Sequence, residues 1–150
     1  MKNLVIGQSG GPTAVINASL YGAVKAFRES GTDGHVLGMI NGIEGFLADH
    51  VMDLSTDLSD KELELLKLTP AAYLGSCRYK LPADLDSEVY PAIFDNFREM
   101  NIGYFLYVGG NDSMDTVDKL SRYAEKIGSD VKFIGIPKTI DNDLVLTDHT

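Results

Sequence analysis

A lysine, a threonine and two aspartates lie close together near the end of the chain, as Lys138, Thr139, Asp141 and Asp143. A carboxylate can take a proton from a substrate hydroxyl or bind a cation, and a neighbouring ammonium group can hold an anion such as phosphate. The cluster therefore suits a step that moves a proton and a phosphoryl group together. Asp-Asn-Asp is equally typical of an ordinary turn, whose side chains bond to nearby backbone amides.

Two glycine-rich loops favour the chemical interpretation. The segments 8–13 and 109–113 each follow a short apolar run and precede residues with the apolar spacing of an amphipathic helix. Such a strand, loop and helix direct backbone N–H groups and the helix N-terminus toward one point, which suits an anion. The first loop matches neither the dinucleotide-binding nor the Walker pattern. Its alternative role is a Gly-Gly turn that only lets the helix pack closely on the strand.

Arg78 is a further candidate for binding phosphate. It follows Gly75 and Ser76 in a segment of small residues, and its planar guanidinium suits bidentate contact with an anion. An ordinary surface arginine in an irregular segment is an equal alternative. Lys80 is expected to face solvent, and Cys77, the single cysteine, to be a buried apolar residue. The three histidines have no spacing that indicates a zinc site.

The elements that must position these residues alternate between strands and helices. Apolar runs predict strands at 3–7, 35–40, 102–108 and 131–136, with a weaker one at 51–54. The last of the four main runs indicates a buried strand that stops at Ile136, so that the polar residues after it emerge at its carboxyl end.

Apolar spacings of three and four residues predict helices between these strands. Ser59 is expected to cap one helix, and either Asp86 or Ser87 another. Alternating strands and helices imply a parallel sheet with right-handed crossovers. We therefore expect an α/β fold with three layers, in which a mostly parallel, doubly wound, Rossmann-like sheet lies between helices.

Three loops should meet at one edge of that sheet. The segments 8–13, 109–113 and 137–143 all leave the carboxyl ends of predicted parallel strands, where ligands bind in open sheets. Together they supply backbone donors, a cation, a hydroxyl group and several carboxylates. This combination favours phosphoryl transfer assisted by a divalent metal ion.

The composition limits the classes of partner. The 150 residues are 44% hydrophobic, enough for one core, and the formal net charge is −9. Such a charge argues against binding to nucleic acid, whereas a small anionic substrate can still be held by backbone amides and local cations. No apolar run reaches the length of a membrane span and no secretory pattern follows Met1, so we expect a cytoplasmic protein without a membrane partner.

Taken together, these motifs resemble those of the phosphofructokinase family. The resemblance rests on motifs that span nearly the whole chain in the family's order, at 7–13 with 15–19, 74–78, 109–113 and 137–143. It implies the family's N-terminal fold and the transfer of a phosphoryl group to the 1-hydroxyl of fructose 6-phosphate, with Mg²⁺ as cofactor.

The resemblance also implies roles for single residues. Asp141 matches the catalytic base, with Thr139 and Asp143 beside it holding the substrate. Gly10 and Gly11 match the loop whose amides meet the phosphoryl donor. The cations at positions 78 and 138 match groups that bind the donor, and the second of them, Lys138, also belongs to the catalytic set.

Position 112 bears on the choice of donor. ATP-using relatives usually carry glycine there, whereas this chain has Asp112, whose bulk and charge would oppose a nucleotide. Lys138 is likewise typical of diphosphate-using relatives. The family commonly has an aspartate that binds magnesium where this chain has Asn111, so the metal ligands are expected among Asn111, Asp112 and Asp141, without a choice between them.

The resemblance predicts that residues 1–150 are the donor-binding N-terminal domain of a longer enzyme, without the second, sugar-phosphate-binding domain. The expected activity is reversible transfer from diphosphate to fructose 6-phosphate, and the isolated part should be nearly inactive. The full protein is expected to form a homo-oligomer, a dimer or tetramer. The alternatives are an ATP-dependent 6-phosphofructokinase and a non-catalytic module that binds phosphate ligands.

Overall fold

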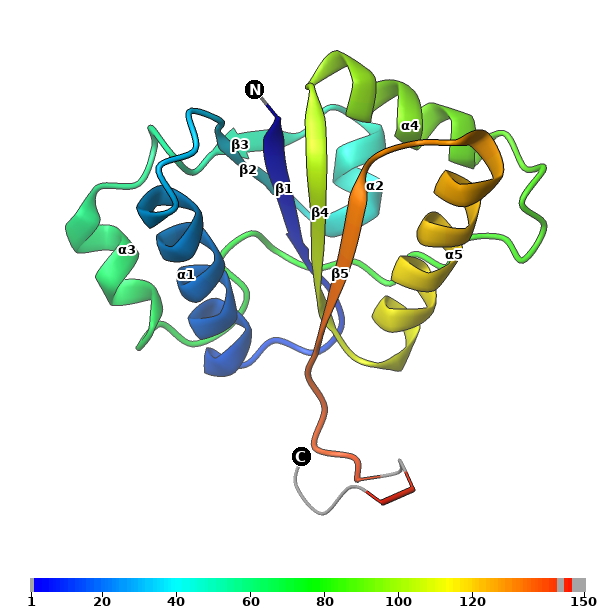
Figure 1. Cartoon of the computed structure of the whole chain (residues 1–150). Coiled ribbons are helices and arrows are strands. Elements are labelled where there is room, and N and C mark those ends of the chain that lie inside the picture. Colours follow the sequence, from blue (N-terminus) through cyan, green and yellow to red (C-terminus); the bar gives the residue numbers. More distant parts are fainter. Residues whose placement is uncertain (1, 143–144, 147–150) are drawn as a thin grey trace.

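Five strands form one sheet in the computed structural model, which describes residues 2–142 and 145–146 (Figure 1). β1 pairs in parallel with β2 and β4, and β4 with β5, whereas β3 runs antiparallel to β2, which gives the order β3-β2-β1-β4-β5. The mostly parallel sheet and the short strand near residue 51 are confirmed. The strands are β1 (Asn3–Gln8), β2 (Val36–Met39), β3 (Val51–Asp53), β4 (Ile102–Gly109) and β5 (Lys132–Pro137).

Helices cover both faces of the sheet, which confirms the expected three layers. In Figure 1, α1 and α3 lie on one side, and α2, α4 and α5 on the other. No helix in the described part of the chain is long and apolar enough to cross a bilayer. The helices are α1 (Ala14–Glu29), α2 (Gly42–Leu47), α3 (Asp60–Leu66), α4 (Val89–Glu99) and α5 (Asn111–Ile127).

β1 and β4 hold the centre of the sheet because their side chains are apolar on both faces. One cluster, which includes Phe97 and Phe105, fills the space under α2, α4 and α5. The other, which includes Ile6 and Leu20, lies under α1 and α3. The strand ends that carry the glycine loops are therefore held in place by packing on both sides.

Two local features differ from the predictions. α2 was not predicted, because a helix of six residues is too short to show a clear apolar period. α4 begins after Glu88, so neither Asp86 nor Ser87 is its cap. The carboxylate of Asp86 instead accepts a hydrogen bond from Lys126 on α5. By contrast, Ser59 caps α3 as expected, in a capping box with Glu62.

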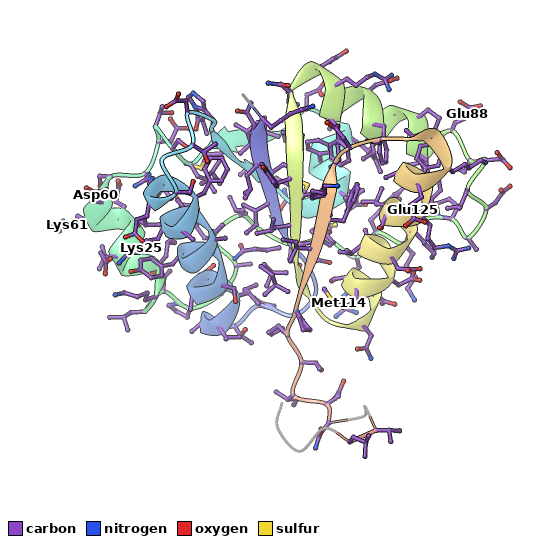
Figure 2. The ribbon with its side chains drawn as sticks, in the orientation of Figure 1. Lys25, Asp60, Lys61, Glu88, Met114 and Glu125 are labelled. Atoms are coloured by element: carbon purple, nitrogen blue, oxygen red, sulfur yellow. The ribbon has the colours of Figure 1, made fainter. Side chains whose placement is uncertain are left out.

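β5 is not the buried strand that its apolar sequence predicted. It lies at the edge of the sheet, and Ile134 is 51% exposed, in a cavity that it lines together with Ala23 and Phe27 of α1. Its other face packs on α5, where a side chain at Gly135 would collide with Met114, the residue labelled near the start of α5 in Figure 2. The apolar run identified the strand correctly, but its burial depends on which elements lie beside it.

Candidate functional site

The three loops that follow β1, β4 and β5 meet at the carboxyl edge of the sheet. Lys138 joins all three, because its backbone N–H donates to Gly109 O at 2.8 Å and its Nζ donates to Gly11 O at 2.7 Å. Gly10 approaches the second loop so closely that a Cβ on it would lie 3.9 Å from Gly110 N. The parallel pairing of the strands is the cause, since it directs all three strand ends the same way.

The shape of the first loop depends on a glycine and on two side-chain hydrogen bonds near its start. Gly10 has a φ of 78°, a left-handed conformation that favours glycine. Its carbonyl accepts a hydrogen bond from Ser76 Oγ at 2.7 Å, and Ser9 Oγ donates to Cys77 O at 3.2 Å. The loop and the segment that carries Arg78 are thus bonded to each other in two places.

The second loop passes directly into a helix. Gly110 is the N-cap of α5, so Asn111 and Asp112 occupy the first turn, at the end of the helix that favours negative charge. Gly109 is required for this tight connection because a Cβ there would lie 2.1 Å from Ser113 Oγ and 2.8 Å from Ser9 O. The helix start therefore lies close against the first loop.

A cavity of about 650 Å³ lies where these segments meet. Arg78 and Lys80 line it from one segment, and Thr139 and Asp141 from another. Lys138 is adjacent but not on the wall, because its ammonium is bonded to Gly11. Asp143 lies outside the described residues. The remaining lining residues are Ser9, Gly10, Cys77, Tyr79, Gly110, Asn111, Asp112 and Ser113.

Lys80 has a role that the sequence did not reveal. Its side chain is 72% exposed, as expected, but its Nζ lies 3.0 Å from Asp112 Oδ1 at the cavity. The pair joins the segment of Arg78 to the first turn of α5. A lysine in an irregular segment has no sequence signal for such a contact, since its partner is 32 positions away in the chain.

Cys77 is buried, as predicted, and its thiol lies 3.7 Å from the hydroxyl of Tyr107 on β4. Burial raises the pKa of Tyr107 well above its ordinary value, because the charged phenolate would be poorly solvated there. Tyr107 is therefore neutral at physiological pH. The charged groups that line the cavity are therefore those of Arg78, Lys80, Asp112 and Asp141.

Oxygen ligands for a cation line the cavity. Asn111, Asp112 and Asp141 are all on its wall, and each carries a side-chain oxygen. No cluster of three or more His, Cys, Asp or Glu side chains suited to a metal ion occurs in residues 2–142 or 145–146. One or two carboxylates are sufficient for Mg²⁺ when phosphates and waters complete its shell. The donor set therefore fits a magnesium ion that arrives with a phosphate ligand.

Comparison with known proteins gives one consistent result. The profile of the family described as Phosphofructokinase matches residues 3–150. A pyrophosphate–fructose 6-phosphate 1-phosphotransferase of Rhodospirillum rubrum is 44% identical, over 98% of this chain and 35% of its own length. One from Halomonas elongata is also 44% identical, over 99% of this chain and 36% of its own length.

Among solved structures, the pyrophosphate-dependent phosphofructokinase of Nitrosospira multiformis matches with a TM-score of 0.89 and 42% identity. The match covers 99% of this chain and 36% of that structure. The chain thus spans about a third of the length of the curated relatives it matches.

Proposed function

The chain belongs to the phosphofructokinase family, and from that premise we propose that it is the donor-binding N-terminal part of a diphosphate–fructose-6-phosphate 1-phosphotransferase. Such an enzyme transfers a phosphoryl group reversibly from diphosphate (pyrophosphate) to the 1-hydroxyl of fructose 6-phosphate. Relatives that carry this name are 44% identical to the chain. The observation that carries the choice of donor is Asp112, whose carboxylate stands on the wall of the cavity.

In this proposal each loop supplies one part of the chemistry. Asp141 takes the proton from the 1-hydroxyl as that oxygen attacks the phosphoryl group. Arg78 binds the diphosphate from the cavity wall, and Lys138 binds it by turning its ammonium from the carbonyl of Gly11 beside that wall; both offset the charge of the group being transferred. Amides of Gly10 and Gly11 bind phosphate oxygens, and Thr139 and Asp143 hold the sugar phosphate.

Mg²⁺ is the proposed cofactor, held through Asn111 and Asp112, with Asp141 as a further oxygen donor. When bound, the ion neutralises the charge that develops on the phosphate oxygens. Asn111 brings no charge of its own, so the carboxylates must supply the electrostatic attraction. The chain's own task is to orient the diphosphate against the helix start and to hold the acceptor's proton at Asp141.

Asp112 disfavours ATP for two reasons. Its side chain occupies space at the start of α5, and its negative charge would oppose the α-phosphate of a nucleotide. Diphosphate is compact, and the neighbouring Lys80 partly offsets the carboxylate at 3.0 Å. The arrangement therefore suits a small inorganic anion.

We extend the proposal to the whole enzyme. The sugar-phosphate site would be completed by a second domain, so residues 1–150 alone should have at most residual activity, because rate depends on holding both substrates together. The full protein is expected to be a cytoplasmic homo-oligomer without nucleic-acid or membrane partners. A buried free cysteine suits a reducing compartment.

The test is an assay of the full-length enzyme that couples formation of fructose 1,6-bisphosphate to NADH oxidation, with either diphosphate or ATP as donor. We expect a clear preference for diphosphate, and Asp112→Gly should improve the use of ATP. Asp60→Gly is the matched control, since Asp60 also lies in the first turn of a helix, on α3 away from the cavity (Figure 2). A wild-type preference for ATP would overturn the donor assignment in favour of an ATP-dependent 6-phosphofructokinase.

A further inference from the structure

Two fully buried amide side chains lie beside the first glycine loop, Gln8 at the end of β1 and Asn17 in α1. Gln8 Nε2 donates to Asn17 Oδ1 at 2.9 Å and to Ile16 O at 3.0 Å. Burying an amide without hydrogen-bond partners destabilises the fold, so a buried pair such as this one must have its hydrogen bonds satisfied. The two side chains flank the loop at residues 9–13 in the sequence and are joined to each other by a hydrogen bond.

The same two side chains also form hydrogen bonds with a segment that is distant in the sequence. Leu74 N donates to Gln8 Oε1 at 2.9 Å, and Tyr73 N donates to Asn17 Oδ1 at 2.8 Å. Asn17 Nδ2 in turn donates to Thr69 O at 2.9 Å. Two side chains of the first strand–loop–helix unit thus pair three backbone groups of the segment 69–74.

This segment leads directly to Arg78. Between α3 and α4 the chain forms no helix or strand, so sheet or helix hydrogen bonds do not set its position. The nearest attachments to the first loop are the bonds of Ser76 to Gly10 and of Ser9 to Cys77. Side chains of the first unit thus help to hold the backbone that carries the guanidinium, together with the bond from Asn41 N to Leu74 O at 2.8 Å.

We infer that Gln8 and Asn17 are positioning residues that hold Arg78 in register with the phosphate-binding loop at Gly10. This inference rests on the proposed function, in which Arg78 offsets the charge of the transferred phosphoryl group. Arginine gives full benefit only when its fork is aligned with the phosphate oxygens. Small displacements of a positioned group reduce the rate much more than they weaken ground-state binding.

The test is a double-mutant cycle in the full-length enzyme. Gln8→Met keeps the length of the side chain and removes all of its hydrogen bonds, and we expect kcat to fall about 10-fold or more, with the KM for fructose 6-phosphate within about 2-fold of wild type. In an Arg78→Ala background the same change should have no further effect on kcat, because its route of action is gone. Equal losses of kcat in both backgrounds would overturn the inference.

A control on the opposite face of the sheet distinguishes a positioning role of Gln8 from a purely structural one. Asn96 Nδ2 also donates to a backbone carbonyl, that of Phe46, at 2.7 Å. Asn96→Leu should lower the melting temperature with little change in kcat. If it lowers kcat as much as Gln8→Met does, the effect of Gln8 is one of stability and the inference fails.

A milder variant covers the case in which Gln8→Met does not fold. Ser76→Ala removes the bond from Ser76 to Gly10 at the surface of the same segment. It should lower kcat a few-fold in the wild-type background and not in Arg78→Ala. An enzyme that prefers ATP would defeat the proposed donor, but the cycle would then be measured with ATP, so the two failures are distinguishable.

Discussion

The β1–α1 and β4–α5 units share one sequence pattern, an apolar strand, a pair of glycines and an amphipathic helix, yet they present different groups to the cavity. Residues 9–13 separate β1 from α1, and their glycines are held in an open loop. Only Gly110 separates β4 from α5, so the helix starts at once. The first unit therefore offers backbone amides, and the second offers side chains on a helix start.

The two units also differ in their buried polar residues. Buried amides at Gln8 and Asn17 fix the position of the first loop relative to the segment 69–78. Near the second loop the buried polar residues are Ser113 and Thr116, and Thr116 only bonds back to the carbonyl of Asp112 within its own helix. The same glycine pattern thus gives an open loop of backbone amides in one unit and a charged helix start in the other.

The largest effect is expected at Asp141, which lines the cavity that both units face. Asp141→Asn should lower kcat about 10²–10⁴-fold, because the proton of the 1-hydroxyl would have no acceptor. The affinity for diphosphate, measured by calorimetry, should change little. Asp130→Asn is the control, since this exposed aspartate pairs with Lys2 away from the cavity. Unchanged turnover in Asp141→Asn would contradict its role as the base, whereas a full-length protein that binds diphosphate without turnover would favour a non-catalytic binding module.

A second prediction concerns the glycines that distinguish the two loops. Gly109→Ala should lower the free energy of unfolding by about 3 kcal/mol, because its Cβ would meet the backbone oxygen of Ser9 at 2.8 Å. Gly10→Ala has room for the methyl group but strains a left-handed backbone, which costs about 1 kcal/mol. Urea unfolding of both variants measures the difference. If Gly10→Ala lowered the free energy of unfolding more than Gly109→Ala does, the inference that the second unit has the tighter connection would be wrong.

A third prediction tests the charge of the second unit. Lys80→Met should raise the KM for diphosphate about 5-fold at low salt, because the carboxylate of Asp112 is then not offset. High salt should reduce the difference, since both groups are exposed. Adding Asp112→Asn should reverse most of the loss. Lys61→Met is the control, because Lys61 lies on α3 (Figure 2) and does not line the cavity. An equal effect in this variant would refute the specific pairing.

The smallest effect is expected at the start of α1. Thr13 is its N-cap residue, but its side chain accepts no capping bond, so Thr13→Ala should change the melting temperature very little. Ser59→Ala removes the capping box of α3 and should cost about 1 kcal/mol. Thermal unfolding compares the two. A clear loss in Thr13→Ala would mean that the first helix start depends on its cap side chain.

Much of the fold was predictable because its signals are local. Apolar runs identified the strands, apolar spacing identified the longer helices, and Ser59 marked a helix start. Alternation of these elements was enough to expect a parallel sheet with three loops at one edge. The short α2 and the start of α4 were missed because six residues show no period and Asp86 bonds to a distant lysine.

The sequence by itself therefore determined the order and type of the main elements and the chemical groups at the strand ends. Only the tertiary structure decided that β5 is an edge strand, that Lys80 meets Asp112, and that Gln8 and Asn17 hold the backbone leading to Arg78. The physical reason is that periodicity and turn chemistry act between near neighbours in the chain. Contacts between remote residues depend on strand order and on how an irregular segment crosses the sheet edge.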